Sequence, residues 1–272
     1  MPILIPIFTL LSVGIACALL LTVASSFWGV KEDGRALSIR EELPGANCGA
    51  CGFSGCDAYA KALADGKTKE TNLCTPGGDG TAKAIAEILG VSAKEVNEQV
   101  AYVACNGLAL PEEKKYDYDG PKTCKAANMF YSGDNYCNFA CLGYGDCIKV
   151  CPRDAIYIND KGLATISPKR CIGCGMCVKE CPNSIIHLIR DTARVVVTCN
   201  NHYKGAKVRQ FCKNGCIACG KCERTCPTGA IVVKDNLASI DYEKCIDCGA
   251  CREVCPVKCI HEGNFTSGSH FE

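Results

Sequence analysis

The sequence predicts an α+β protein in which one N-terminal transmembrane helix precedes a small helical domain and two copies of a cysteine-rich fold. Three observations predict it: an uncharged apolar segment at the start, 26 cysteines in 272 residues, and an internal repeat built on Cys-Pro. Most cysteines stand in C-x2-C steps, which point neighbouring thiols at one centre. This arrangement suits a metal or iron–sulfur centre better than a disulfide framework. Thiolate ligands must stay reduced, so we expect a reducing compartment.

Residues 1–30 predict the transmembrane anchor, because they carry no charge and are long enough to cross a bilayer as a helix. A cleaved signal peptide is the alternative, but no Lys or Arg precedes the apolar segment. Lys31, Arg35 and Arg40 follow it, and Trp28 lies at the same end. Basic residues favour the cytoplasmic side. We therefore expect a single-pass protein of the cytoplasmic (inner) membrane, with its cysteine-rich domains in the cytoplasm.

Residues 31–95 predict a small helical domain around one [4Fe–4S] cluster. Its cysteines are spaced C-x2-C-x4-C-x17-C and are Cys48, Cys51, Cys56 and Cys74. Four thiolates can also hold zinc, but this spacing, beside the motifs that follow, favours iron–sulfur. We expect helices over Asp57–Asp65 and Thr81–Leu89. A third helix is expected to start at the capping box of Ser92 and Glu95.

After a connector at residues 96–136, the chain repeats one unit as CPRDAIYI, CPNSIIHL, CPTGAIVV and CPVKCIHE. Three of the four are preceded by C-x2-C-x2-C-x3. In bacterial-type two-cluster ferredoxins, the cysteine before proline binds the other cluster of the pair. The repeat therefore predicts two such ferredoxin domains in tandem, at residues 137–198 and 199–272.

The crossed pattern assigns three [4Fe–4S] clusters in these domains. One set is Cys216, Cys219, Cys222 and Cys255; its neighbour is Cys226, Cys245, Cys248 and Cys251; the third is Cys151, Cys171, Cys174 and Cys177. The segments AIYINDKGLATIS and AIVVKDNLASID predict β-hairpins between the cluster loops. Because such a fold has little ordinary core, metal binding and folding should be coupled.

The remaining cluster of the first ferredoxin domain is one ligand short. Cys141, Cys147 and Cys181 fit the pattern. Tyr144 stands where the other motifs carry a cysteine. We expect Cys137, one helical turn before Cys141, to supply the fourth thiolate. A [3Fe–4S] cluster on three cysteines and a tyrosine oxygen ligand are the alternatives.

Four further cysteines belong to no motif: Cys105, Cys124, Cys199 and Cys212. They can hold a sixth cluster or remain unpaired thiols, and their spacing does not decide. Cys259 replaces the small residue of the repeat and is expected to pack in the core. The four histidines show no metal-ligand spacing. The sequence thus predicts five [4Fe–4S] clusters and leaves a sixth open.

The charge is unevenly distributed along the chain. Residues 32–119 carry fifteen Asp and Glu against nine Lys and Arg, whereas residues 169–224 carry eleven basic residues and three acidic ones. Such segments are commonly solvated faces. The sharper hypothesis is a basic docking surface for an acidic redox partner. No nucleic-acid reader motif is present, so we expect no nucleic-acid partner.

The sequence contains no motif for independent catalysis. It lacks the Gly-rich dinucleotide signature, the nucleophile elbow and the helical His pair. We therefore expect no catalytic residue and no cofactor site besides the cluster ligands. A chain equipped only with one-electron carriers moves electrons between partners. It can do so within a larger complex, as a free-standing membrane-anchored polyferredoxin feeding a reductase, or as a reductant of a redox sensor.

The order of motifs resembles a known family. An N-terminal anchor followed by LPGANCGACGFSGC, NLCTPGG, VACNG and CLGYGDCIKVCPRDAI is similar to the B-type subunit of the Rnf complex, in the longer form found in anaerobes. The resemblance implies a membrane complex that oxidises reduced ferredoxin and reduces NAD+, coupled to Na+ or H+ transport. This chain would accept electrons from soluble ferredoxin. It would pass them to the other Rnf subunits, with the Cys48 cluster nearest the membrane. It would thus be part of a translocase without a catalytic site of its own.

Overall fold

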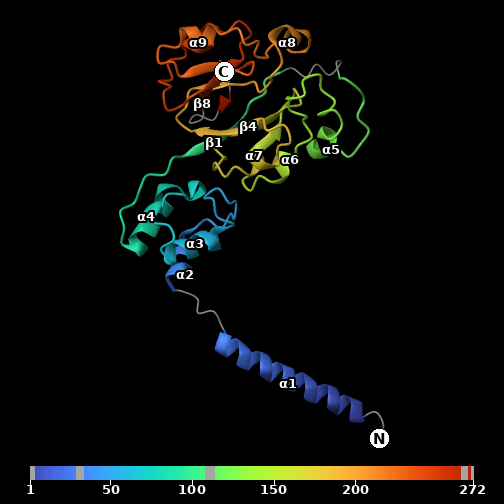
Figure 1. Cartoon of the computed structure of the whole chain (residues 1–272), viewed down its shortest axis with the longest axis vertical. Helices are drawn as coiled ribbons and strands as arrows, with labels where there is room; N and C mark the ends of the chain where they lie inside the picture. Colours follow the sequence, from blue (N-terminus) through green and yellow to red (C-terminus); the bar gives the residue numbers. More distant parts are fainter. Residues whose placement is uncertain (1–3, 29–33, 108–113, 265–268, 271–272) are drawn as a thin grey trace.

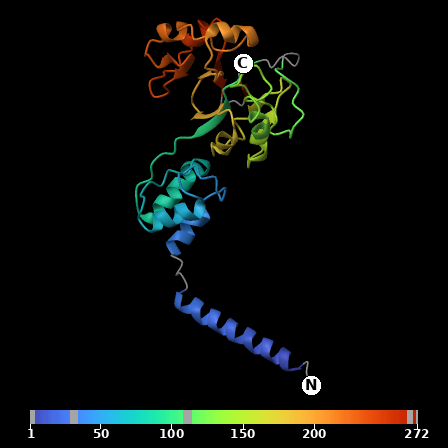
Figure 2. The ribbon, with the colours of Figure 1, turned by 45° about the vertical axis from the view of Figure 1, so that its right-hand side comes forward.

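The computed structural model describes residues 4–28, 34–107, 114–264 and 269–270. Helix α1 (Leu4–Trp28) stands apart at one end of an elongated molecule (Figure 1). A small helical domain follows, and two cysteine-rich α+β units lie together at the other end. The turned view in Figure 2 keeps this order.

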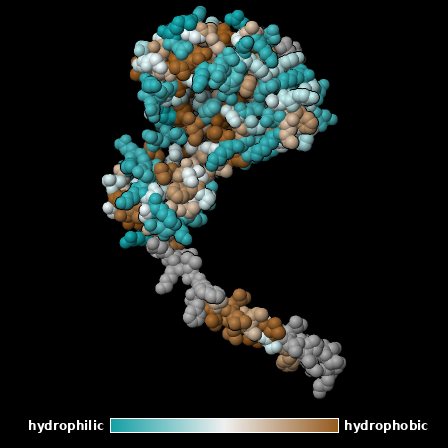
Figure 3. Space-filling model, in the orientation of Figure 1, coloured by the Kyte–Doolittle hydropathy of each residue, from teal (hydrophilic) through white to brown (hydrophobic). Residues whose placement is uncertain are grey.

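Helix α1 exposes apolar side chains along the part of it that is described (Figure 3), among them Leu11, Leu19 and Leu20. The hydroxyl of Thr22 donates to the carbonyls of Ala18 and Leu19 at 3.1 and 2.9 Å, so this polar group bonds within the helix. None of the helices formed by the described residues is long and apolar enough to cross a membrane. The anchor at residues 1–30 therefore stays a prediction.

The small domain packs three α-helices and one turn of 3-10 helix around a compact apolar core. Its elements are α2 (Gly34–Glu42), α3 (Cys56–Ala64), η1 (Thr75–Gly77) and α4 (Gly78–Leu89). Ile39, Tyr59 and Ile85 are fully buried between the helices. The Tyr59 hydroxyl donates to the Glu70 carbonyl at 2.6 Å, which satisfies the one polar atom this ring carries inward. The two helices expected over residues 57–65 and 81–89 are confirmed.

The third helix expected from Ser92 is wrong, because residues 92–98 run without helical structure. The Val96 N–H donates to Asp79 Oδ1 at 2.8 Å, and the Glu95 carbonyl accepts from Asn72 Nδ2 at 2.9 Å. These side chains belong to the rest of the small domain. They take the backbone groups that a helix would have paired internally, so tertiary contacts override the local capping signal.

The first cysteine-rich unit consists of short helices and short strands. They are α5 (Cys124–Asn128), α6 (Asp146–Lys149), β2 (Ile156–Ile158), β3 (Ala164–Ile166), α7 (Met176–Glu180) and β4 (Ile186–Arg190). Strand β1 (Gln99–Val103) pairs antiparallel with β4, with Gln99 opposite Arg190. The segment from 96 onward, expected only as a connector, thus supplies a strand to this unit.

The second unit has the same organisation. Its elements are β5 (Val195–Val197), α8 (Gly205–Phe211), α9 (Lys221–Thr225), β6 (Ile231–Lys234), β7 (Leu237–Ile240), α10 (Ala250–Glu253), β8 (Ile260–Asn264) and β9 (Ser269–His270). Strand β5 pairs antiparallel with β8. Residues 195–197, which we expected in the first ferredoxin domain, therefore belong to the sheet of the second.

The predicted hairpins are confirmed as the antiparallel pairs β2–β3 and β6–β7. Asp235 and Asn236 form the second turn with φ of 50° and 63°, as a two-residue hairpin turn requires. A glycine with φ between 68° and 78° precedes each one-turn helix α6, α7, α9 and α10, namely Gly145, Gly175, Gly220 and Gly249. Only glycine adopts this left-handed conformation without strain, and it turns the motif back on itself.

The contacts between the two units include a small apolar cluster and a partly buried ion pair. Val100 and Ile189 of the first sheet pack with Val196 of the second, and all three are buried. Arg190 donates from Nη2 to Asp247 Oδ2 at 2.7 Å and to the Cys245 carbonyl at 3.3 Å. This contact ties the end of β4 to a cysteine loop of the second unit.

Candidate iron–sulfur sites

Four cysteines of the small domain converge on the loop before α3. Cys56 is the first residue of α3, and Cys74 directly precedes η1. Asn47, with φ of 46°, fixes the loop because its Oδ1 accepts a hydrogen bond from the Cys56 N–H at 2.9 Å. Burial raises the pKa of Cys74 to about 11, and the three neighbouring thiols of the motif add to the rise. The loop thus brings together the four thiols that the spacing grouped.

Two pockets in the cysteine-rich units are each lined by one of the predicted sets of four cysteines. The first unit supplies Cys151, Cys171, Cys174 and Cys177; the second supplies Cys226, Cys245, Cys248 and Cys251. Backbone N–H groups point at these sulfurs: that of Ala101 lies 3.4 Å from Cys171 Sγ, and that of Ala155 lies 3.3 Å from Cys151 Sγ. Such donors stabilise charge on thiolate ligands.

A third predicted set gathers in the apolar core of the second unit, where Cys216, Cys222 and Cys255 pack together. Burial raises the pKa of Cys222 to about 11, and the charges of Cys216, Cys219 and Cys255 contribute to it. The buried Cys259 also touches this set, with its Sγ 3.6 Å from Cys255 Sγ. Its thiol lowers the pKa of Cys255 to about 5 and also lowers the pKa of Cys216.

The pocket around the incomplete motif of the first unit is lined by a cysteine of α5, Cys124, and not by the expected Cys137. The pocket that contains the motif cysteines is lined by Cys124, Cys141, Cys147 and Cys181. Burial raises the pKa of Cys147 to about 12, and the charges of Cys141, Cys124 and Cys181 add to this. Cys137 lines a different pocket, which Cys141 also lines.

The sequence around Cys124 explains how it reaches this position. Thr123 caps α5, with its hydroxyl accepting from the Ala126 N–H at 3.1 Å. The Lys125 N–H donates to Asp146 Oδ2 at 3.0 Å, so α5 is fixed beside the first turn of α6. Burial raises the pKa of Cys124, and hydrogen bonds from the backbone of residues 144–146 oppose the rise. Cys124 therefore lies next to the turn that contains Tyr144, the position where the other motifs carry a cysteine.

Tyr144 takes no part in this pocket. Its hydroxyl donates to Asp134 Oδ2 at 3.3 Å, and its ring packs edge-on against Tyr118 at 6.0 Å between centroids. Asp134 is buried and also accepts from Lys114 Nζ at 2.6 Å. The alternative of a tyrosine oxygen ligand therefore has no geometric support, because the hydroxyl is engaged on the other side.

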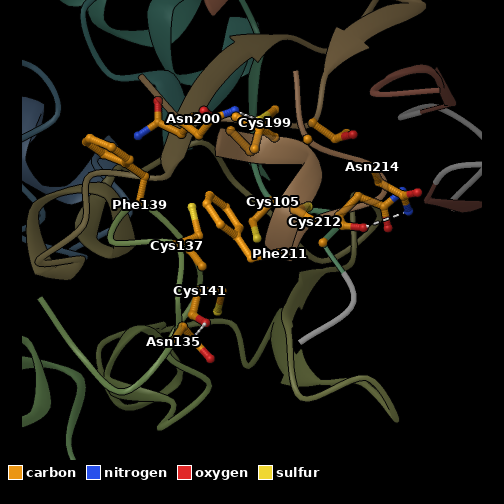
Figure 4. A pocket seen from close by; sticks show the side chains of 18 of the residues that line it. Cys105, Asn135, Cys137, Phe139, Cys141, Cys199, Asn200, Phe211, Cys212 and Asn214 are labelled. Carbon is orange, nitrogen blue, oxygen red and sulfur yellow. Dashed lines mark hydrogen bonds between the residues drawn. The ribbon is translucent and has the colours of Figure 1, made fainter. Parts of the chain in front are cut away.

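Cys137 joins three cysteines that belong to no motif. One pocket is lined by Cys105, Cys137, Cys199 and Cys212 and also by Cys141, which it shares with the pocket of the incomplete motif (Figure 4). Burial raises the pKa of Cys105 to about 12 and that of Cys137 to about 11, with the charges of Cys199 and Cys212 contributing to the latter. The set considered from the sequence contained Cys124 in place of Cys137. In the structure, Cys137 lines this pocket and Cys124 lines the pocket of the incomplete motif.

This pocket, which we call the junction pocket, lies where the two units meet. Cys105 follows β1 of the first unit, whereas Cys199 follows β5 and Cys212 ends α8 of the second. Figure 4 shows these side chains and the Phe211 ring around one opening. The Cys216 N–H donates to Cys199 Sγ at 3.2 Å, and the charge of Cys141 affects the pKa of Cys105. The pocket therefore adjoins one cysteine set of each unit.

The cysteine sets follow one another through the molecule. The small domain lies next to the first unit, because the charge of Cys48 is close enough to raise the pKa of Cys174. The two sets of the first unit are adjacent as well, because the charge of Cys177 raises the pKa of Cys147. The junction pocket lies between the first unit and the second. In the second unit, the charge of Cys226 raises the pKa of Cys251. The six sets thus form a continuous series from the small domain to the second unit.

The donor chemistry fits iron–sulfur clusters. Most thiols of the six sets are wholly or partly buried, with Cys219 and Cys248 exposed, and backbone N–H groups point at several of the sulfurs. Buried thiols with raised pKa values stay protonated at neutral pH, so cluster binding must release these protons. Within the described segments, no three His, Cys, Asp or Glu side chains converge closely enough to hold a single metal ion.

The fold and these sites define a ferredoxin-type iron–sulfur protein with several [4Fe–4S] clusters. Family models agree: one described as a putative Fe-S cluster matches residues 43–76, and two described as 4Fe-4S dicluster domains match residues 137–185 with 215–259, and 170–230. Cys105 and Cys124 lie outside every matched segment. These two cysteines could therefore be assigned only from the structure.

Known relatives make the family plain. The chain is 41% identical over 258 residues to the B-type subunit of the Na(+)-translocating ferredoxin:NAD(+) oxidoreductase complex of Acetobacterium woodii, covering 95% of this chain and 77% of the relative. It is 44% identical to the proton-translocating counterpart of Clostridium ljungdahlii (75% and 72% covered). It is 38% identical to the corresponding member of the ion-translocating oxidoreductase complex of Methanosarcina acetivorans (88% and 90% covered). The chain belongs to the family of B-type subunits of these Rnf-type complexes, as its motifs suggested.

Proposed function

We propose that this chain is the electron-input subunit of an ion-translocating ferredoxin:NAD+ oxidoreductase. It accepts electrons from reduced ferredoxin and relays them to membrane subunits that reduce NAD+ and transport Na+ or H+. The observation that carries this proposal is the unbroken series of six four-cysteine sets. Relatives named for Na+ and for proton translocation support the same role. The complex is the enzyme, and this chain contributes one-electron carriers to it.

We assign one [4Fe–4S] cluster to each set, which makes six. The sets are Cys48, Cys51, Cys56 and Cys74; Cys151, Cys171, Cys174 and Cys177; Cys124, Cys141, Cys147 and Cys181; Cys105, Cys137, Cys199 and Cys212; Cys216, Cys219, Cys222 and Cys255; and Cys226, Cys245, Cys248 and Cys251. When bound, these clusters supply reversible one-electron storage. The chain's own residues position the thiolates, exclude water and direct N–H groups at the sulfurs.

Residues 1–30 are proposed as the single membrane anchor, with the cysteine-rich domains on the cytoplasmic side. The uncharged sequence of α1 and the basic residues that follow it support this orientation. The helical domain at residues 31–95 is the first cysteine-rich part after the anchor. This order supports electron output through the Cys48 cluster to the other subunits of the complex.

The helix α8 is proposed as the docking surface for ferredoxin. Residues 192–222 carry six basic residues and no acidic one. On α8, Lys207 and Arg209 are exposed, whereas Val208 and Phe211 line the junction pocket. A partner with an acidic surface would be attracted to this face of α8. Only α8 would then separate the partner from the junction cluster. The docking surface predicted for residues 169–224 is thus assigned to the single helix α8.

The experiment that tests the function uses the complex extracted anaerobically from its native membrane. We expect NAD+ reduction by reduced ferredoxin in a preparation that contains flavin and this chain. A flavin-free preparation that accepts electrons from ferredoxin but does not reduce NAD+ would favour the free-standing polyferredoxin. A preparation that ferredoxin cannot reduce would contradict both.

A charge-reversal pair tests the docking surface. Lys207→Glu/Arg209→Glu should slow reduction of the chain by ferredoxin about tenfold or more at low ionic strength, with the difference shrinking in salt. Lys61→Glu/Lys83→Glu, on exposed positions of α3 and α4, is the matched control and should leave the rate nearly unchanged. Equal slowing by both pairs would reject α8 as the docking surface.

A further inference from the structure

The four Cys-Pro repeats differ at one buried position. In each repeat, the fourth residue after the cysteine is buried to the same degree, at 2% exposure: Ala155, Ile185, Ala230 and Cys259. The residue before it adopts a positive φ in every repeat. The backbone therefore presents the same position to the same surroundings four times. Only in the last repeat does that position carry a hydrogen-bond donor in its side chain.

The Cys259 thiol lies against the cluster ligand Cys255. Its Sγ lies 3.6 Å from Cys255 Sγ, within sulfur hydrogen-bond distance, and it packs in the same buried cluster as Cys216. Its backbone is held in place because the Cys259 carbonyl accepts from the Thr198 N–H at 2.8 Å and from the Thr198 hydroxyl at 3.1 Å. The thiol is thus fixed beside the sulfurs and shielded from water.

The other repeats show what this thiol adds. In the first repeat, the Ala155 N–H reaches Cys151 Sγ at 3.3 Å, so a backbone donor to the Cys-Pro sulfur is already part of the unit. The backbone of Cys259 likewise lowers the pKa of Cys255. The S–H of Cys259 is an additional donor, and it lies against a ligand sulfur of this set. Ala155 and Ala230 offer no such group.

The geometry points to Cys259 as a tuning residue that raises the reduction potential of the cluster held by Cys216, Cys219, Cys222 and Cys255, without being a ligand itself. Reduction adds one negative charge to a cluster, part of which spreads to its sulfurs. A hydrogen bond to those sulfurs stabilises the reduced form more than the oxidised form. The effect is larger where water is excluded, because the local dielectric constant is low.

This inference rests on the proposed cluster assignment and adds a function for a buried cysteine outside the six sets. The Cys216 N–H contact to Cys199 makes the tuned cluster a neighbour of the junction cluster. A raised potential at that position lets the tuned cluster hold an electron while the junction cluster is emptied toward the membrane.

The test is an anaerobic redox titration of the full-length chain, followed by electron paramagnetic resonance and paired with iron analysis. Cys259→Ala reproduces the residue of the first and third repeats, and it should shift one midpoint potential to a more negative value while the iron content stays unchanged. Cys259→Ser restores a donor and should recover part of the shift. Val233→Ala trims the same apolar cluster and should leave all potentials in place.

Three results would overturn the inference. Unchanged potentials in Cys259→Ala would show that the thiol does not tune the cluster. Equal shifts in Cys259→Ala and Val233→Ala would make the effect one of packing. Loss of about four irons in Cys259→Ala would make Cys259 a ligand, which would contradict the cluster assignment as well.

Discussion

The exchange of Cys124 and Cys137 between two clusters can be tested by counting iron. Six [4Fe–4S] clusters contain about 24 irons per chain. Removing two ligands of one cluster costs that cluster alone, about four irons, whereas removing one ligand from each of two clusters costs up to about eight. Since Cys124 and Cys181 line one pocket and Cys137 lines another, two double variants distinguish the assignments.

We expect Cys124→Ala/Cys181→Ala to retain about 20 irons per chain and Cys137→Ala/Cys181→Ala to retain about 16. The assay is iron and acid-labile sulfide analysis of the anaerobically purified full-length chain. Cys17→Ala, in α1, is the control and should retain the wild-type content. The opposite order, about 16 for the first double variant and about 20 for the second, would refute the pocket assignment and restore Cys137 as the ligand of the incomplete motif.

Three further predictions concern stability and its dependence on pH, measured by anaerobic denaturant titration of the cluster-loaded chain. Arg190→Met removes the charged hydrogen bonds to the loop at Asp247 and should cost about 1 kcal/mol, since the guanidinium is partly exposed; no loss would show that this ion pair does not stabilise the contact between the units. Asp134→Asn removes the buried negative charge that pairs with Lys114 and should cost about 2 kcal/mol, more than Tyr144→Phe; the reverse order would contradict the role of Asp134. Burial lowers the pKa of His187, so the unfolded chain binds a proton more readily than the folded chain as pH falls below about 6.5. Stability should therefore fall on acidification, less so in His187→Gln, and equal slopes would contradict this.

The repeated motifs predicted most of the fold, because ligand spacing and hairpin turns are local signals. The C-x2-C-x2-C-x3-C-P motif shows which thiols meet, and the glycines that precede the one-turn helices make that turn possible. The hairpin β6–β7 could be predicted from its Asp235-Asn236 turn for the same reason. In each case, residues close in sequence determine the conformation.

The parts that the sequence did not predict depend on distant contacts. Cys124 lines the pocket of the incomplete motif because Asp146 and Glu180 hold α5 beside α6 and α7. The pairing of β1 with β4, and of β5 with β8, moves two predicted boundaries, because each strand pairs with a partner far along the chain. At Ser92, the capping box does not start a helix, because side chains from the rest of the domain bond the backbone of residues 95 and 96. A pattern in a single sequence does not show which residues far apart in the chain come into contact.

The central claim is that electrons pass through a series of clusters joined at the interface between the two units. Its most direct test is ferredoxin-dependent NAD+ reduction by the purified complex carrying Cys105→Ala/Cys212→Ala, which removes two ligands of the junction cluster. We predict that the chain keeps about 20 irons, that a small photochemical reductant still reduces its remaining clusters, and that ferredoxin-driven NAD+ reduction is lost. Wild-type NAD+ reduction by a complex lacking those four or so irons would contradict the account.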